Sequence, residues 1–363
     1  MSSNAVAGAS IAGKGRSWSA VLARYKQPRP ARSTVEIAIT ALPFVALWAL
    51  SATAVAYGYW TGLLLTIPAA GFLVRLFILQ HDCSHGALFA RRSTNDWTGR
   101  VIGVFTLTPY DYWRRTHAVH HATAGNLDKR GIGDVNTLTV KEYRALSWWG
   151  RARYRVYRHP LVMLGLGPAW LFICQYRLPL GLMRAGVQPW TSTIVTNLGV
   201  ALPVAGLLWL MGIGPFLMVQ APITLMAATV GVWLFYIQHQ FEETHWSEGN
   251  DWNLQHAALY GSSHYDLPIL LRWATGNIGI HHVHHLLSTV PFYRLPEVLR
   301  DYPDLRDIGR VTFLQSLSCI KLVLWDESTK RLVSFREAQA TIRHRQFGSP
   351  LNYHSGKVSS NLQ

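Results

Sequence analysis

The chain has 363 residues, of which 49% are hydrophobic and only 15% are charged. A typical soluble protein is about 25% charged, so this composition does not fit an ordinary soluble domain. The formal net charge of +15 comes from 34 Lys and Arg residues against 19 Asp and Glu residues. This excess lies in an N-terminal arm and one polar segment between apolar stretches. It therefore favours contact with anionic lipid headgroups, and we expect no nucleic-acid partner.

The first 34 residues form a basic arm that contains no acidic residue. The arm lacks the apolar core of a signal peptide. Its composition, rich in Ser and Ala, would fit a short organellar transit peptide. A flexible cytoplasmic arm over residues 1–34 is the alternative that we prefer.

Two stretches without any Asp, Glu, Lys or Arg predict the membrane-spanning part of the chain. They cover residues 37–74 and 185–241. A membrane-spanning helix needs about 20 predominantly apolar residues, so each stretch can supply a helical hairpin. We expect four spans, at about 37–57, 60–80, 192–212 and 216–238.

A shorter apolar run lies between the two hairpins. Residues 161–174 are too few for a span and fit an interfacial segment at about 161–176. If this run crossed the membrane, the polar segments on either side of it would face opposite compartments. Segment 81–158 has thirteen basic residues against six acidic ones, and the arm is basic as well. The positive-inside rule then places both termini and the polar segments in the cytoplasm.

Three histidine clusters lie in the polar parts of the chain, at His81–His85, His117–His121 and His281–His285. Their intervals of three and four residues put imidazoles on one face of a helix, about one turn apart. Imidazole is the commonest metal-binding side chain because it coordinates as a neutral group near pH 7. The clusters hold nine histidines, more than one tetrahedral ion can use. They therefore predict two metal ions side by side.

The position of the clusters at the ends of apolar helices indicates a lipid-like substrate. The C–H bonds of such a substrate resist hydrolysis, so their cleavage needs a redox metal and O2. Zinc performs no redox chemistry, whereas iron accepts imidazole ligands and does. We expect two Fe ions with O2 as co-substrate. No dinucleotide motif follows a predicted strand and no haem motif is visible, so electrons are expected from a separate protein.

The clusters have the forms HxxxH, HxxHH and HxxHH, and with their hairpin spacing the sequence resembles the membrane-bound di-iron fatty acid desaturases over roughly residues 35–300. The flanking Gln80, Trp113 and Leu286 are also similar to family members. The resemblance implies an all-α membrane protein in which two hairpins of transmembrane helices carry a cytoplasmic helical cap with the di-iron site. We expect a multi-pass protein of a bacterial inner membrane. Residues 301–363 would form a cytoplasmic C-terminal region with a disordered end.

The resemblance also implies the metal ligands. Eight come from the three clusters, and His239 matches a histidine that family members carry just after the fourth span. His282 falls at a variable position and is not expected to bind. Asp82, Asn277 and Glu242 are expected beside the ligands, where an acceptor for the second ring N–H would orient an imidazole. The implied ligands are His81, His85, His117, His120, His121, His239, His281, His284 and His285.

The implied activity is oxygen-dependent desaturation of a lipid-linked acyl chain, with electrons from a ferredoxin- or cytochrome b5-type donor. The stretch 133–140 resembles members that act at the delta-12 (omega-6) position of a monounsaturated chain. Histidine spacing alone leaves open a di-iron hydroxylase or ketolase acting on an alkane, fatty acid or carotenoid. A metal transporter is a remote alternative, because transport sites lie inside spans and these histidines lie outside them.

Overall fold

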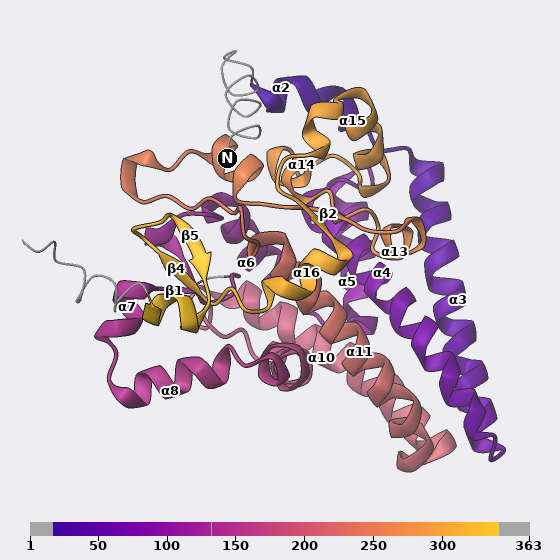
Figure 1. Cartoon of the computed structure of the whole chain (residues 1–363). Helices are drawn as coiled ribbons and strands as arrows, with labels where there is room; N and C mark the ends of the chain where they lie inside the picture. The colour runs from indigo at the N-terminus through magenta and orange to yellow at the C-terminus, as the bar shows by residue number, and fades with distance from the viewer. Residues whose placement is uncertain (1–16, 132, 341–363) are drawn as a thin grey trace, which may run out of the picture.

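The computed structural model describes residues 17–131 and 133–340, and most of them are helical. Within these residues, four helices are long and apolar enough to cross a membrane. They extend from a cap of shorter elements towards the lower right of Figure 1. The expected helical architecture with four candidate spans is thus confirmed. The four are α3 (Pro30–Ala56), η2 with α4 (Trp60–Leu65 and Thr66–His85), α10 (Val187–Met211) and α11 (Ile213–His239).

The helices extend beyond the expected spans at the end nearest the cap. The first begins at Pro30, where proline is favoured because its missing N–H needs no partner in the first turn. The second continues to His85 and ends at Gly86, whose φ of 70° is the left-handed conformation that glycine adopts without strain. The first histidine cluster therefore lies on the last turns of a membrane helix. A rigid helix, rather than a loop, orients these imidazoles.

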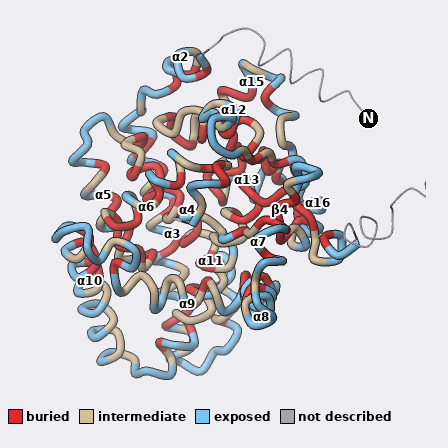
Figure 2. Tube along the Cα trace, turned by 90° about the vertical axis from the view of Figure 1, so that its left-hand side faces the viewer, coloured by how far each residue is buried: buried red, intermediate tan, exposed pale blue. Residues whose placement is uncertain are grey.

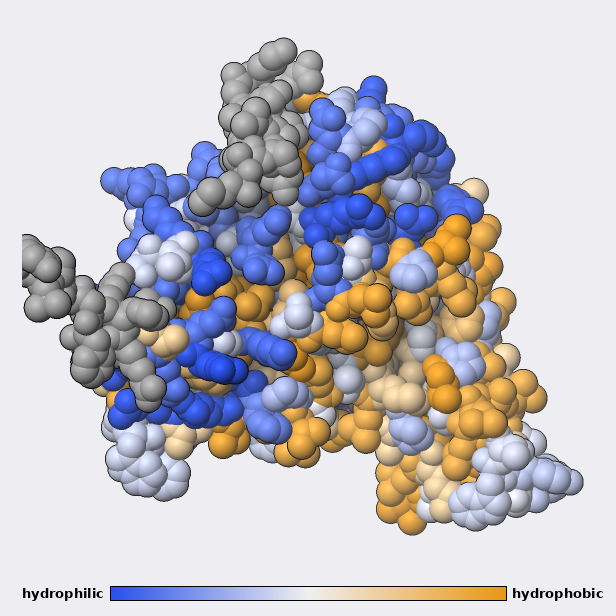
Figure 3. Space-filling view, viewed as in Figure 1, coloured by the Kyte–Doolittle hydropathy of each residue, from blue (hydrophilic) through white to orange (hydrophobic). Residues whose placement is uncertain are grey.

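The outer surfaces of the four helices are apolar. Only 6% of the most apolar window of α10 is buried inside the protein, and Trp209 is 85% exposed. Figure 3 shows this hydrophobic surface below a hydrophilic cap, and Figure 2 shows buried residues concentrated in the cap and where the helices meet it. An exposed apolar surface of this extent suits contact with lipid.

The cap contains short helices and two small sheets that the sequence did not predict. In one sheet β4 pairs with β1 in parallel and with β5 in antiparallel orientation, and in the other β2 and β3 are parallel. The helices are α5 (Arg92–Phe105), α6 (Tyr110–Thr123), η3 (Leu127–Lys129), α7 (Val140–Ala145), α8 (Trp148–Tyr157), η6 (Gly249–Asp251), α12 (Leu254–Tyr260), α13 (Ile269–Ala274), α14 (His281–Leu286), η7 (Phe292–Arg294), α15 (Leu295–Asp301), η8 (Pro303–Arg306) and α16 (Phe313–Cys319). The strands are β1 (Leu138–Thr139), β2 (His264–Asp266), β3 (Arg310–Thr312), β4 (Leu324–Asp326) and β5 (Arg331–Val333).

The described part of the N-terminal arm packs against the cap. It contains α2 (Trp18–Leu22) and η1 (Ala23–Tyr25), whose Trp18, Leu22 and Tyr25 are buried in one cluster with residues of α14 and α15. The Tyr25 hydroxyl donates to Asp301 Oδ2 at 2.6 Å. The expectation of a flexible arm is wrong here, because three apolar side chains at helical spacing bury one face. Residues 1–16, and the end expected to be disordered, lie outside the described residues.

The expected interfacial segment is a series of short helical elements. It consists of a π-helical turn, η4 (Val162–Leu166), then α9 (Gly167–Ile173) and η5 (Gln175–Arg177). Residues 162–173 rise about 18 Å at 1.5 Å per residue, well short of a bilayer core of about 30 Å. The stretch packs against α11.

The core between α3, α4 and α11 is mainly apolar and contains one buried ion pair. Arg75 on α4 and Glu36 on α3 are 2% and 1% exposed, and the guanidinium donates to the carboxylate. Arg75 also donates through Nε to Thr40 at 3.1 Å and lies over the ring of Trp273. Arg32 reaches the same carboxylate at 2.5 Å. The pair links the first hairpin to the segment that precedes the third histidine cluster.

Candidate metal centre

Four helices bring nine histidines to one place at the base of the cap. The last turns of α4 carry His81 and His85, and the last residue of α11 is His239. The second cluster lies on α6 and the third on α14. All nine implied ligands belong to two groups of ring nitrogens, each with its atoms within 4.8 Å of one another.

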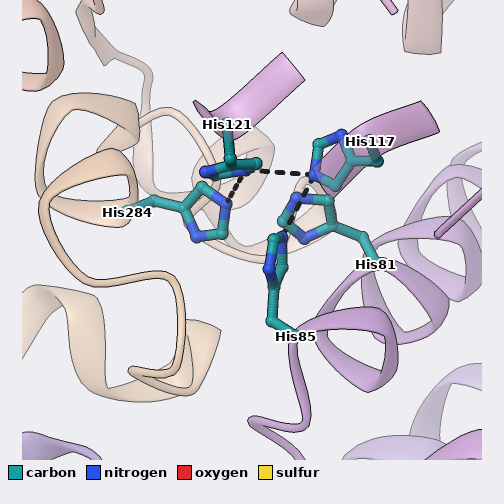
Figure 4. Close-up of side chains that lie close together, drawn as sticks. All are labelled: His81, His85, His117, His121 and His284. Atoms are coloured by element: carbon teal, nitrogen blue, oxygen red, sulfur yellow. Dashed lines mark hydrogen bonds between the residues drawn. The ribbon is translucent and has the colours of Figure 1, made fainter. Parts of the chain in front are cut away.

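The first group contains five histidines from three helices (Figure 4). The Nε2 atom of His117 lies 3.1 Å from that of His85 and 3.1 Å from that of His121. The Nε2 atoms of His121 and His284 are 3.2 Å apart. His81 completes this group.

The second group contains four buried histidines, again from three helices: His120, His239, His281 and His285. The Nε2 atom of His281 lies 3.1 Å from that of His239 and 3.0 Å from that of His285. No carboxylate or thiolate belongs to either group in the described part of the chain. The donor atoms of both groups are therefore imidazole nitrogens.

Each HxxHH cluster is divided between the two groups in the same way. His117 and His121 belong to the first group, whereas His120 belongs to the second. On α14, His281 and His285 belong to the second group and His284 to the first. Residues four apart on a helix lie nearly above one another, whereas the residue at i+3 is rotated away from both. Each of these helices therefore serves both groups.

The arrangement fits a transition metal. Ligand nitrogens about 2.1 Å from a common ion lie roughly 3 Å from one another at right-angled positions, as these nitrogens do. Nε2 of His120 is buried and lacks a hydrogen-bond partner. An unpartnered buried nitrogen is costly unless something binds it, so a metal in each group would satisfy the atoms that the fold brings together.

Burial also holds the imidazoles in the protonation state that binds metal. Loss of solvent lowers the pKa of His117, His121 and His285 well below the ordinary value, and neighbouring imidazoles lower each pKa further. The same causes lower the pKa of His281 and His284. These five rings are therefore neutral near pH 7, with a nitrogen lone pair free for coordination.

Two histidines of the second group are oriented by hydrogen bonds from their Nδ1 atoms. Nδ1 of His120 lies 2.5 Å from Oδ1 of Asp134, and Nδ1 of His239 donates to the Gly261 carbonyl at 3.2 Å. Each bond fixes the tautomer in which Nε2 carries the lone pair. In both rings this Nε2 atom faces the other imidazoles of the group.

Comparison with known sequences shows which protein family carries this site. The family model described as "Fatty acid desaturase" matches residues 55–314, well over half of the chain. The chain belongs to the fatty acid desaturase family. It is therefore an oxidoreductase that acts with O2, and the resemblance found from the histidine clusters is confirmed.

Several relatives of this desaturase are known by name, and two of those described here are named as lipid desaturases. It is 41% identical over 326 residues to a fatty acid desaturase of Bacillus subtilis (strain 168), covering 90% of this chain and 92% of that protein. It is 25% identical over 278 residues to the sn-1 oleoyl-lipid 12-desaturase of Anabaena variabilis, with coverage of 68% and 72%. Identity to the sn-1 acyl-lipid omega-3 desaturase (ferredoxin) of a Synechocystis strain is 27% over 247 residues, with 61% of each chain covered.

The three residues expected beside the ligands differ in their placement. Asp82 is buried, with Oδ1 3.5 Å from Nδ1 of His81 and Oδ2 accepting from the Phe292 backbone N–H at 2.7 Å. Asn277 instead donates to the Phe292 carbonyl at 3.2 Å. Glu242 is exposed. Within the described residues, no hydrogen bond or ion pair joins Asn277 or Glu242 to a histidine of either group, so that expectation is corrected for both.

Sequence reasoning missed the carboxylate that does contact a histidine of the two groups. Asp134 was noted only as part of the stretch 133–140, and no spacing rule connects it to His120. In the sequence, an indication was that Asp134 directly follows a glycine. In the structure this glycine, Gly133, has a φ of 75°, and the turn there brings the loop back onto α6. A Cβ at Gly133 would lie 3.1 Å from Cβ of His120. His282, in contrast, belongs to neither group, as expected, and its Nε2 bonds the Leu305 carbonyl at 2.8 Å.

A large apolar cavity of the desaturase reaches the histidines. Its volume is about 1020 Å³, and His81, His117 and His281 form part of its wall. The rest of the wall comes mainly from apolar side chains of α4, α11 and the η4–α9 stretch. A cavity of this character can hold a hydrocarbon chain with some of its carbons beside the histidine groups.

Proposed function

We propose that the protein is a di-iron acyl-lipid desaturase that places a second cis double bond in a monounsaturated chain at the delta-12 (omega-6) position. The observation that carries this proposal is the pair of histidine groups at the wall of a long apolar cavity. Neither feature alone would indicate removal of hydrogen from an unactivated chain. Together they bring a redox metal site and a hydrocarbon into contact.

Iron is supported by the donor set and by the chemistry. Nine imidazoles suit several divalent metals, but a substrate without polar groups at the reacting carbons needs an oxidant. When bound, a pair of iron ions would supply that oxidant from O2. The balance is one O2 reduced to two waters, with two electrons and two protons from adjacent methylenes. The other two electrons and two protons come from outside.

The residues of this chain hold and align both partners of the reaction. His120 and His239 present Nε2 to the second group because Asp134 and Gly261 bind their Nδ1 atoms. Trp113 stacks on the ring of His117 at 4.5 Å between centroids and also lines the cavity. Its indole would separate the first histidine group from solvent on the substrate side and keep the acyl chain in apolar surroundings.

Electrons would come from an external carrier of the ferredoxin or cytochrome b5 type. The Synechocystis relative carries ferredoxin in its name. The basic arm and segment 81–158 would attract an acidic carrier, and the positive-inside rule puts this surface in the cytoplasm. We propose an integral protein of the bacterial inner membrane with both termini and the histidines on the cytoplasmic side.

The delta-12 position is supported by two observations. The Anabaena relative is named an oleoyl-lipid 12-desaturase. The stretch that resembles such members also contains Asp134, which contacts His120. The substrate would be an oleoyl chain of a membrane glycerolipid, which reaches the cavity from the bilayer.

Expression in a host that makes oleate but no polyunsaturated chains tests the proposal. Gas chromatography with double-bond location should detect linoleate, and none with His120→Ala present at equal protein level. A new double bond at delta-9 in saturated chains would overturn the position while keeping desaturation. A hydroxylated chain in place of a double bond would show that the enzyme is a di-iron hydroxylase.

A further inference from the structure

One wall of the cavity is the short helical stretch that does not span the membrane. Nearly every residue from Val162 to Tyr176 lines the cavity. The facing wall is α11, where lining residues extend from Thr224 to Gln238. At 1.5 Å per residue this wall is about 21 Å long. The cavity therefore continues far beyond the histidines, and its shape there decides how deep a chain can lie.

The helical stretch departs from regular geometry where it lines the cavity. Residues Val162–Leu166 form a π-helical turn, closed by a hydrogen bond from the Gly167 N–H to the Val162 carbonyl. A π-turn accommodates an extra residue within a helix, and such turns are frequent at functional sites. Val162, Met163 and Leu166 of this turn line the cavity.

Two residues hold the turn in this form. Gly167 leaves room for it, because a Cβ there would lie 2.7 Å from the Val162 carbonyl oxygen. Thr229 on α11 donates its hydroxyl to the Leu164 carbonyl at 2.5 Å. This hydroxyl satisfies a backbone oxygen inside the turn and ties the turn to α11. Neither Gly167's missing side chain nor Thr229's hydroxyl is required by an ordinary α-helix at this place.

The turn lies at a defined distance from the metal centre. Thr229 precedes His239 on α11 by ten residues, about 15 Å along the helix axis. A chain that passes the histidine groups would therefore meet Met163 and Leu166 well beyond its reacting carbons. A contact at that depth does not touch the reacting atoms, but it limits how far the chain can slide.

We propose that the π-turn at Val162–Leu166 is a specificity-determining element of the desaturase. By placing Met163 and Leu166 in the cavity wall, it sets the register in which an acyl chain lies against the histidine groups. This inference rests on the proposed function. Reverting the turn to α-helix would remove one residue from the wall, a change of about 1.5 Å in rise. Such a change is comparable to one carbon of the chain.

The effect should be large enough to measure in the products. One methylene in an apolar pocket changes the discrimination between substrates by about 10- to 200-fold. A moved wall should therefore alter the ratio of products from chains of neighbouring length, or the position of the new double bond. A purely structural role for the turn would lower the amount of enzyme and leave both unchanged.

The experiment compares two glycines of the same stretch. Gly167→Ala places its methyl group against the Val162 carbonyl, so the turn must rearrange. Gly165→Ala adds the same methyl group where no atom lies within 4 Å, and Gly165 does not line the cavity. Thr229→Val is the second test variant, since it removes the hydroxyl without adding bulk. All variants are expressed in the same oleate-producing host, which is also fed acyl chains one and two carbons shorter and longer.

We expect Gly167→Ala and Thr229→Val to change the product ratio between neighbouring chain lengths by about tenfold, or to move the double bond. Gly165→Ala should keep the wild-type ratio. Unchanged ratios and positions in both test variants would overturn the inference, even with reduced total product. If Gly167→Ala does not accumulate, Thr229→Val decides alone. Failure of the proposed function is distinguishable, because the wild-type protein would then form no double bond in any fed chain.

Discussion

His120 and Asp134 lie 2.5 Å apart, measured from Nδ1 of the imidazole to Oδ1 of the carboxylate, although fourteen residues separate them in the chain. The imidazole is 1% exposed and its Nε2 has no hydrogen-bond partner. The carboxylate therefore holds the ring so that its free nitrogen points into the second histidine group. This contact couples the loop after α6 to the metal centre.

Replacing this carboxylate should weaken metal binding without unfolding the protein. Asp134→Asn keeps an oxygen acceptor but removes the charge that supports the imidazole as a ligand. Loss of such a partner typically costs about 10- to 100-fold in metal affinity or activity. Competition of purified protein with a chelator, followed by iron analysis, measures the change. Asp304→Asn, at an exposed position, is the matched control, and equal iron retention by both variants would contradict the assignment.

The division of the histidines predicts that single substitutions remove one metal site at a time. The intact protein should contain about two irons per chain, one in each imidazole group. His85→Ala in the first group and His239→Ala in the second should each lower this to about one, with loss of activity in both. Elemental analysis of purified protein is the measurement. His282→Asn should retain both ions, since His282 bonds a backbone carbonyl instead. Active protein that holds only zinc would refute the iron assignment.

The buried ion pair between Arg75 and Glu36 should contribute to stability as a coupled unit. Removing one partner of a buried pair costs about 3–5 kcal/mol, because the other charge is left in apolar surroundings. Arg75→Met should be milder than Glu36→Gln, since the carboxylate retains Arg32 at 2.5 Å. Free energies of unfolding in mild detergent give the comparison. The double variant should cost less than the sum of the single ones, and simple additivity would argue against the pair.

Labelling of single cysteines tests the proposed orientation. The background carries Cys174→Ser, because the other cysteines, Cys83 and Cys319, are buried. A reagent that cannot cross the membrane should label Tyr57→Cys, in the turn after α3, from outside intact cells. It should label Lys129→Cys, in the cap, only after the cells are opened. Labelling of Lys129→Cys from outside would place the cap on the other face.

Turnover should depend on an added electron carrier. Purified enzyme with NADPH and O2 should be inactive, and ferredoxin with its reductase should restore product formation. Raising the ionic strength from about 0.1 M to about 1 M shortens the screening length from about 10 Å to about 3 Å, so turnover should fall if basic residues attract the carrier. Oxygen consumption matched to double bonds formed measures the rate. Sustained turnover without any carrier would contradict this dependence.

Local patterns in the sequence were sufficient to predict the helical hairpins and the ligand types. Apolar stretches without charge form spanning helices because, inside the bilayer, backbone N–H and C=O groups can form hydrogen bonds only with one another. Histidines at intervals of three and four residues determine imidazoles on one face of a helix, whatever surrounds it. Both properties depend only on residues close together in the chain. Eight of the nine histidines in the two groups lie in such clusters, whereas His239 was expected only from the family resemblance.

Tertiary packing decided how those histidines are shared and what surrounds them. The intervals in the second cluster turn His120 away from His117 and His121, but the positions of α11 and α14 around α6 decide which other histidines join each of them. Asp134, rather than Glu242, reaches a ligand because a turn at Gly133 folds its loop back onto α6. The packing of Trp18 in the cap likewise needed a partner surface from nearly three hundred residues away. Each of these contacts depends on the relative positions of distant segments, which are set by how whole helices pack and not by local periodicity.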